Sequence, residues 1–219
     1  MFAVIFEVVP KPERWDEYLG LAKLLRPEIE KIDGFIDNER FESRHTKGRL
    51  LSLSTWRDEK AVIRWRTLAA HHTVQEKGRF EVFQDYHLRV GEITVDNRPP
   101  PGQRLQQRLD ETEVGDARFV TITELPGVGE KPATDGLASE IGAPPVGMQG
   151  LVDYDIYEGL YNPGKLLLLG SWRDARAAGD WTSRTPRGRA LRHRQVRIVR
   201  DYGMFDRREA PQYYPDVQR

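Results

Sequence analysis

The spacing of apolar residues along the chain predicts short strands alternating with amphipathic helices. Phe2–Val9 is rich in β-branched and aromatic residues, which is typical of a strand. Pro12 suits the first turn of a helix, and apolar residues then recur at helical spacing as far as Asp33-Gly34, a stop signal. Two more strands are predicted over Phe35–Ser43 and Arg49–Trp56, with a turn between them.

A second helix and a last strand complete this unit. Asp58 is predicted to cap a helix that carries Ala61 and Trp65 on one face, and His87–Val95 is the predicted last strand. The order βαββαβ is that of a ferredoxin-like unit, in which helices cover one face of a sheet. The strand that ends at Trp56 carries apolar residues on both faces, so the other face must be covered too.

The same pattern occurs twice in the chain. Residues 34–66 align with residues 150–182 without a gap at an offset of 116, and 12 of the 33 pairs are identical, where chance gives roughly two. Ile5-Phe6-Glu7 resembles Ile122-Thr123-Glu124 at an offset of 117. We therefore expect an α+β protein of two tandem ferredoxin-like βαββαβ modules, at residues 1–97 and 118–206, with a linker at 98–117 and a tail at 207–219. Their bare sheet faces are expected to bury each other in a dimeric α+β barrel within one chain.

The composition excludes several classes of function. Among the 219 residues, 34 Lys and Arg balance 34 Asp and Glu, so no overall field favours nucleic acid or an anionic membrane. There is no cysteine, and the five histidines show no metal-ligand spacing, so no metal site is expected. No run approaches the ~18 apolar residues of a membrane span and no signal peptide is predicted, which makes a cytoplasmic location the expectation.

Trp65 with His71 and His72 is the most informative cluster. If the helix continues, His72 lies two turns beyond Trp65 on the same face, and His71 lies about 120° away. An indole beside an imidazole in a cavity could hold a flat aromatic ligand, and the imidazole could act as a base or ligate haem iron. The alternative is a core tryptophan followed by a solvated helix end. The second copy repeats the tryptophan as Trp181 but has Arg187-Gly188 in place of the histidines.

Glu7 is the other candidate catalytic residue. Its strand is otherwise apolar on that face, so its carboxyl could have a raised pKa and accept a substrate proton. The alternative is an ordinary glutamate that binds a backbone amide or an arginine. Phe6 and Leu53 are expected to line the substrate site together with Trp65.

These residues together resemble the antibiotic biosynthesis monooxygenase (ABM) family of the dimeric α+β barrel superfamily. The matching stretches are VIFEVVP, LRPEIEKIDGFIDNERF, LLSLSTWRDEKAVIRWR and the segment from His71 to DYHLRV, with GLVDYDIYEGLYNPGKLLLLGSWRD and VRIVRDYGMF in the second copy. Members of that family include cofactor-free oxygenases of polycyclic phenols and haem-degrading oxygenases. The haem-degrading members use an Asn on the first strand, near where Glu7 stands. They also use a Trp that Trp65 matches and an axial His that His71 or His72 would supply.

The resemblance implies an oxygenase that oxidises a flat aromatic substrate with O2 and without a bound cofactor. His71, His72 or Glu7 would deprotonate a phenol-like group, the anion would reduce oxygen, and Trp65 would shape a dry cavity. Two alternatives stay open: a haem-binding and haem-degrading monooxygenase, and a non-catalytic binding or scaffold protein. The expected partner is a small aromatic molecule, and association of two such chains into a homodimer stays open.

Overall fold

The computed structural model describes residues 1–105, 110–125, 137–182, 192–215 and 217, and these form two similar halves. The elements of the first half are β1 Phe2–Pro10, α1 Trp15–Glu30, β2 Phe35–Ser43, β3 Leu50–Trp56, α2 Glu59–Thr67, α3 Ala69–Lys77 and β4 Phe83–Asp96. Those of the second half are β5 Phe119–Leu125, α4 Leu137–Ile141, β6 Leu151–Gly159, β7 Leu166–Trp172, α5 Ala175–Thr182 and β8 Arg192–Gly203. A 3-10 turn at Pro12–Arg14 precedes α1, and a π-helical turn at Gly78–Val82 joins α3 to β4. No helix in these ranges combines the length and the apolar character that crossing a membrane requires.

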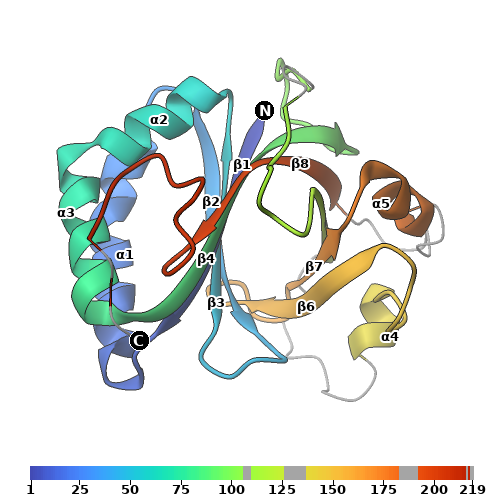
Figure 1. The fold of residues 1–219 in the computed structure, drawn as a ribbon, viewed down its shortest axis with the longest axis horizontal. Coiled ribbons are helices and arrows are strands. Elements are labelled where there is room, and N and C mark those ends of the chain that lie inside the picture. Colours follow the sequence, from blue (N-terminus) through green and yellow to red (C-terminus); the bar gives the residue numbers. More distant parts are fainter. Residues whose placement is uncertain (106–109, 126–136, 183–191, 216, 218–219) are drawn as a thin grey trace.

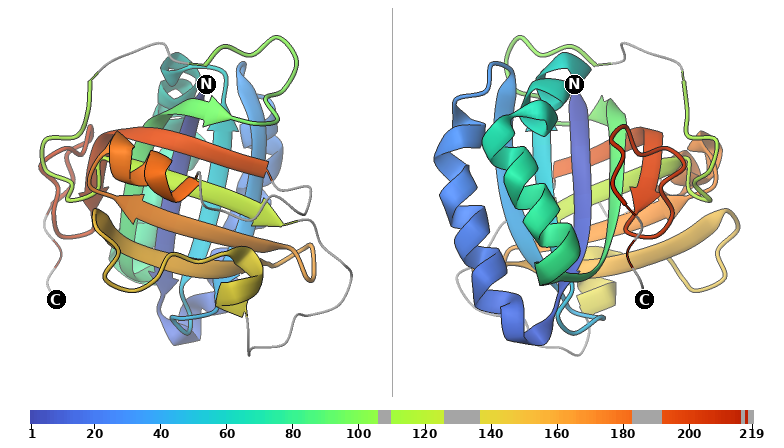
Figure 2. Two further views of the ribbon diagram at one scale, coloured as in Figure 1. Left: turned by 90° about the vertical axis from the view of Figure 1, so that its right-hand side faces the viewer. Right: turned by 60° about the vertical axis from the view of Figure 1, so that its left-hand side comes forward.

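All eight strands form one closed antiparallel barrel in the order β1-β3-β2-β6-β7-β5-β8-β4. The first half contributes the run β4-β1-β3-β2 and the second half the run β8-β5-β7-β6, which is the same ferredoxin-like order. Helices α1, α2 and α3 lie on one side of the barrel, and α4 and α5 lie on the other (Figures 1 and 2). Closure leaves no strand edge unpaired, because β2 pairs with β6 and β4 pairs with β8.

The junction between β2 and β6 is symmetric in the repeat. Glu42 pairs with Glu158, which is its own equivalent 116 residues later, and the pairs on either side exchange in the same way. Such self-complementary pairing is what two copies of one unit make about a two-fold axis.

Two repeated glycines bring a strand close to a helix in each half. Gly34 has a φ of +91°, and a Cβ there would lie 2.7 Å from the Cβ of Ala61. Gly150 has a φ of +81°, and a Cβ there would lie 2.4 Å from the Cβ of Ala177. Both the backbone conformation and the space therefore require glycine, which explains why the repeat keeps this pair of residues.

Alternation along the strands sends one set of side chains into the barrel and the other toward the helices. The interior set is a single apolar cluster that includes Met1, Ala3, Ile5, Leu51, Leu53, Val120, Ile122, Leu167 and Leu169. The other face of β1 presents Phe2, Val4, Phe6 and Val8 to the helical layer. Neighbouring residues of one strand thus face two separate environments, which decides which of them reach the candidate site.

Candidate active site

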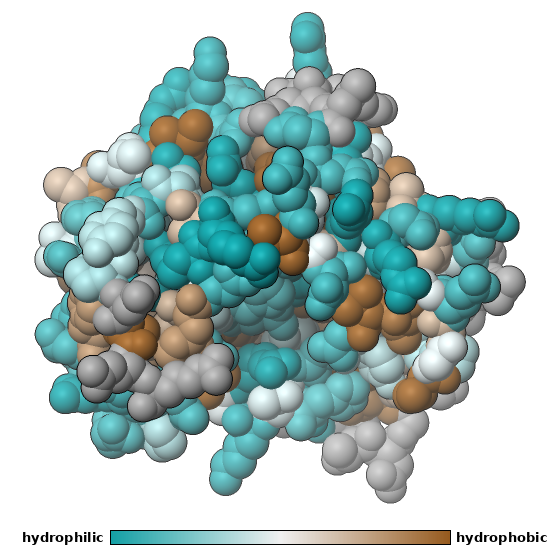
Figure 3. All heavy atoms as spheres, viewed as in Figure 1, coloured by the Kyte–Doolittle hydropathy of each residue, from teal (hydrophilic) through white to brown (hydrophobic). Residues whose placement is uncertain are grey.

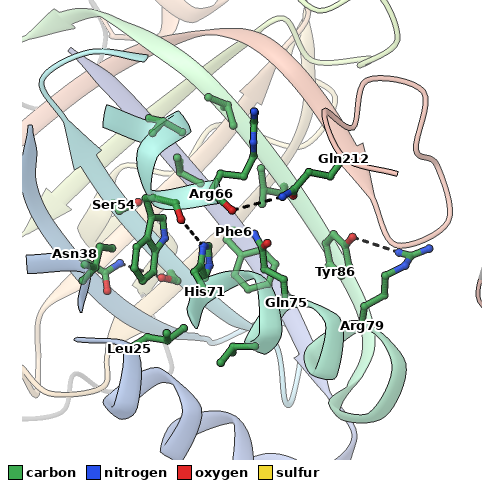
Figure 4. Close-up of a pocket in the computed structure, with 18 of the residues that line it drawn as sticks. Phe6, Leu25, Asn38, Ser54, Arg66, His71, Gln75, Arg79, Tyr86 and Gln212 are labelled. Atoms are coloured by element: carbon green, nitrogen blue, oxygen red, sulfur yellow. Dashed lines mark hydrogen bonds between the residues drawn. The ribbon is translucent and has the colours of Figure 1, made fainter. Parts of the chain in front are cut away.

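The first half encloses a cavity of about 200 Å³ between the outer face of its sheet and helices α1, α2 and α3. Its walls are mostly apolar and include Val4, Phe6, Leu25, Val62 and Leu88. The segment after β8 passes over the open side and contributes Pro211, Gln212 and Tyr214 (Figures 1 and 4). Hydrophilic residues cover most of the surface on this face and apolar ones appear in small separate patches (Figure 3), so the apolar lining lies beneath the surface.

Trp65 and His71 form one wall of this cavity as a stacked pair. Helix α2 ends just before Leu68, whose ψ of 127° is extended, and α3 begins directly after it. The break turns the chain so that the two rings lie 4.0 Å apart between centroids, at an angle of 16°. The prediction that His72 shares the face of Trp65 is wrong, because it assumed an uninterrupted helix. His72 is exposed, and its Nδ1 lies 3.0 Å from the hydroxyl of Tyr214.

His71 presents a hydrogen-bond acceptor to the cavity. Its Nδ1 lies 3.0 Å from the carbonyl oxygen of Trp65. A carbonyl oxygen only accepts, so Nδ1 carries the proton and Nε2 keeps a lone pair. Burial lowers the pKa of His71 to about 4, so the ring is neutral at physiological pH. Within the described part of the chain Nε2 has no hydrogen-bond partner, and Figure 4 shows the ring among the residues that surround the pocket.

A polar strip on β2 and β3 crosses the sheet side of the cavity. Arg40 Nη1 donates to Asn38 Oδ1 at 3.0 Å, and Asn38 Nδ2 donates to Ser52 Oγ at 3.0 Å. Ser54 Oγ accepts from the indole nitrogen of Trp56 at 2.9 Å. Sequence reasoning missed these residues, although alternation carries the signal: polar residues at 38, 40, 52 and 54 all fall on the side of the strands that faces the helices.

The cavity is electropositive. Among the residues that the structure describes, the lining contains one carboxylate, Glu59, and six arginines, Arg26, Arg40, Arg66, Arg79, Arg200 and Arg207. Two of the arginines hold the segment after β8 in place. Arg79 donates to the carbonyl of Met204 at 2.7 Å, and Arg207 donates to the carbonyl of Gln212 at 2.9 Å. An excess of positive charge over an apolar cavity favours an anionic ligand.

Glu7 and Leu53 do not reach this cavity, because strand alternation points both of them into the barrel. The Glu7 carboxylate accepts from Arg89 Nη2 at 2.6 Å and from the hydroxyl of Tyr157 at 2.5 Å. Burial raises the pKa of Glu7, but Arg89, the Tyr157 hydroxyl, His87 and Arg49 together outweigh burial and hold the pKa below its ordinary value. The predicted rise in pKa is therefore wrong, and the alternative of an arginine-bound glutamate is confirmed. Phe6, on the opposite face of the same strand, does line the cavity.

In the equivalent region of the second half, the described residues pack into one apolar cluster. Trp181, the repeat of Trp65, is buried with its ring centroid 5.6 Å from that of Trp172. Helix α4 adds Leu137 and Ile141 to the same apolar cluster. Residues 187 and 188, which the sequence comparison sets against His71 and His72, lie outside the described residues.

A closed α+β barrel with an apolar cavity and a neutral histidine on its wall is typical of a protein that binds a small molecule. The histidine is a residue type that enzyme active sites often use. Residues 1–77 match the family model of the antibiotic biosynthesis monooxygenases. A jasmonate monooxygenase ABM of Pyricularia oryzae (strain 70-15) is 44% identical over 220 residues, which cover 98% of this chain and 99% of that protein. The chain belongs to the ABM family, and this relationship identifies it as an ABM-like monooxygenase.

Solved structures also resemble this chain, at low sequence identity. A crystal structure of an aldoxime dehydratase superposes with a TM-score of 0.53 at 10% identity, over 90% of this chain and 80% of that one. A crystal structure of an antibiotic biosynthesis monooxygenase gives a TM-score of 0.36 at 19% identity, over 45% of this chain and 100% of that one. At such identities the first likeness shows a common fold and nothing about the reaction.

Proposed function

We propose that the protein uses O2 to oxidise a small, largely apolar carboxylic acid of the jasmonate class in the cavity beneath α1, α2 and α3. The name of the full-length relative supports this class of substrate. Jasmonate is a cyclopentanone with a hydrocarbon chain and a carboxymethyl group, so it is apolar apart from one ketone and one carboxylate. The cavity offers apolar walls, polar groups on one side and an excess of arginine. The observation that carries the proposal is this cavity with the lone pair of His71 on its wall.

Five of the lining residues have a direct role in the proposed reaction. Phe6 and Trp65 hold the apolar body of the substrate. His71 accepts a hydrogen bond at Nε2 from the hydroxyl of the enol form of the substrate ketone, in which the neighbouring carbon is electron-rich toward O2. Because its pKa is lowered to about 4, the imidazole is a weak base, so it acts by accepting a hydrogen bond and not by storing a proton. On the sheet side, the Ser52 hydroxyl can donate to a ketone oxygen, because its Oγ accepts from Asn38 Nδ2 at 3.0 Å and its own hydrogen is free to turn toward the cavity.

We further propose that the reaction needs no resident organic cofactor. Oxidation of a CH2 group to a carbonyl by O2 balances with the substrate as the electron donor and releases one water. Hydroxylation needs two more electrons from an external reductant. Haem is disfavoured by size, since the cavity of about 200 Å³ lies below the ~300–1,000 Å³ of pockets for drug-sized ligands. The first strand also presents Val4 and Phe6 to the cavity, where haem-degrading members of the family use an Asn.

A flat phenolic substrate is the second candidate. The Trp65–His71 stack gives the cavity a planar wall, which favours a flat ring. The jasmonate class is preferred because the lining has one carboxylate against six arginines, and a neutral phenol would leave that charge uncompensated.

We also propose that the barrel is an internal dimer of two ferredoxin-like modules, of which the first carries the site and the second supports it. The common strand order and the β2–β6 pairing centred on Glu42 and Glu158 support this arrangement. A purely non-catalytic scaffold is disfavoured, because a protein kept only for its shape has no reason to keep one half hollow.

The test is turnover of jasmonate by the purified protein under isotopically labelled O2, with product mass measured in the presence and absence of hemin and of a nicotinamide reductant. We expect a product that carries one labelled oxygen atom and a rate that hemin leaves unchanged. His71→Ala is expected to lower kcat/KM about 100-fold. His45→Ala, at an exposed histidine that does not line the cavity, is the matched control and keeps the wild-type rate. Turnover of a phenol in place of jasmonate moves the substrate to the aromatic class, and turnover of neither contradicts the proposal.

A further inference from the structure

Two arginines of the cavity differ from the other four in having no polar partner for the side chain in the described ranges. Arg66 on α2 and Arg200 on β8 both line the cavity, and neither side chain makes an ion pair or a hydrogen bond within the described ranges. The Nε of Arg66 is buried without a partner, as are those of Arg40, Arg79 and Arg207, but those three donate through their terminal nitrogens. A buried donor left unpaired costs free energy, so this guanidinium is poised to gain from a ligand that accepts its hydrogen bonds.

These side chains share one corner of the cavity with Arg207. All three lie close enough to Tyr202 for their charges to act on it. Burial raises the pKa of Tyr202 to about 12, and Arg207, Arg66 and Arg200 each oppose that rise. Glu59, the carboxylate of the cavity lining, stands seven residues before Arg66 on the same helix, about 10 Å along its axis. The corner therefore carries concentrated positive charge.

We propose that Arg66 and Arg200 bind the carboxylate of the substrate and so select small apolar acids over their neutral analogues. Guanidinium groups bind a carboxylate with two parallel hydrogen bonds, which fixes direction as well as position. The side chain of Arg66 extends away from His71 on the side of Gln212 (Figure 4). A substrate anchored there lays its apolar body toward the wall of Trp65 and His71. The orientation toward His71 rests on the proposed function, whereas the selection for a carboxylate does not.

The other arginines of the cavity are already engaged. Arg26 Nε pairs with Glu30 at 2.9 Å, and Arg40 donates to Asn38 at 3.0 Å. Arg79 and Arg207 hold backbone carbonyls of the segment after β8. In the second half, Thr182 stands at the position equivalent to Arg66. The arginine without a polar partner therefore occurs in the half that contains the cavity and not at the equivalent position of the other half.

The test measures binding separately from turnover, by calorimetric titration with octanoate and jasmonate and with the neutral methyl ester of each. The wild-type protein is expected to bind each acid at least about tenfold more tightly than its ester, since the ester lacks the negative charge that a guanidinium binds. Arg66→Met and Arg200→Met are each expected to weaken the acids about tenfold and the esters less than about twofold. Arg64→Met is the matched control, because Arg64 lies on the same helix but pairs with Asp33 at 3.3 Å outside the cavity.

The outcomes distinguish the proposed carboxylate site at Arg66 and Arg200, here called the anchor, from the proposed reaction. Equal binding of acid and ester by the wild type, or equal loss of both in Arg66→Met, overturns the anchor. An acid-specific loss in Arg40→Met with none in Arg66→Met also overturns it, since the carboxylate would then bind at the polar strip. Acid-selective binding without turnover keeps the anchor and rejects the proposed reaction. Arg66→Lys, which keeps the charge, retains part of the preference and serves if Arg66→Met does not fold.

Discussion

The two halves of the barrel share a strand order and differ in what lies between sheet and helices. In the first half, polar side chains at Asn38, Arg40 and Ser52 face three helices across a cavity. The second half has apolar or aromatic residues at the equivalent positions, Tyr154, Ile156 and Leu168, and they pack into one cluster with Trp172 and Trp181. The same strand order thus holds either a cavity or a packed apolar core. The side chains on the helix-facing side of the strands decide which of the two forms.

The largest difference between the halves is expected from their equivalent tryptophans. Trp181→Ala removes a buried indole from a packed cluster and should lower the free energy of unfolding by about 3–5 kcal/mol. Trp65→Ala opens a wall that already borders a cavity, so it should cost about 1–2 kcal/mol while abolishing substrate binding. Urea denaturation of both variants measures this. Equal losses of unfolding free energy in the two variants would show that Trp65 is packed as tightly as Trp181. That result would contradict the difference in packing between the two halves.

The second comparison concerns a glutamate in each half whose side chain points into the barrel. Glu7 pairs with Arg89 at 2.6 Å, and Glu124 pairs with the equivalent arginine, Arg194. Glu7→Gln and Glu124→Gln should each cost about 3 kcal/mol, because each leaves a buried guanidinium without its anion. The folded fraction of Glu7→Gln should keep its turnover and pH profile. If Glu7→Gln kept the wild-type stability and lost turnover, Glu7 would be a catalytic residue after all.

A smaller effect is expected from one buried histidine in each half. Burial lowers the pKa of His71 to about 4, and burial together with Arg194 lowers that of His193 to about 4. Since the unfolded chain takes up these protons near pH 6.5, stability should fall as the pH drops below 6.5 toward 4, by about 1–2 kcal/mol per histidine between pH 6.5 and 5. His71→Gln and His193→Gln should each remove their own share of that slope in denaturation curves measured at several pH values. A wild-type slope that neither variant changes would contradict the assignment.

Much of the fold was predictable because the repeat is strong and its signals are local. Alternating strands, the stop at Gly34 and the cap at Asp58, whose side chain accepts from the amide of Ala61 at 2.9 Å, follow from short stretches of sequence. The first strand also carried the information that Phe6 and Glu7 face opposite ways. Treating them as neighbours in one site ignored that alternation.

The site was harder to predict because long-range packing determines it. No glycine or proline marks the break at Leu68, yet that break sets His71 against Trp65 and turns His72 outward. The segment after β8 was predicted only as a tail, whereas Tyr214 packs against His72 and lines the cavity. Contacts across some 140 residues of sequence leave no local pattern.

The central claim is that substrate occupies the hollow half alone. Its most direct test gives the first half the side chains of the second, as Arg40→Ile with Ser52→Leu, and titrates jasmonate and its methyl ester by calorimetry. The wild type is predicted to bind one equivalent per chain. The variant is predicted to bind neither ligand while its unfolding free energy changes by less than about 1.5 kcal/mol, since apolar side chains then fill the space. Undiminished binding of both ligands by the variant would contradict the account.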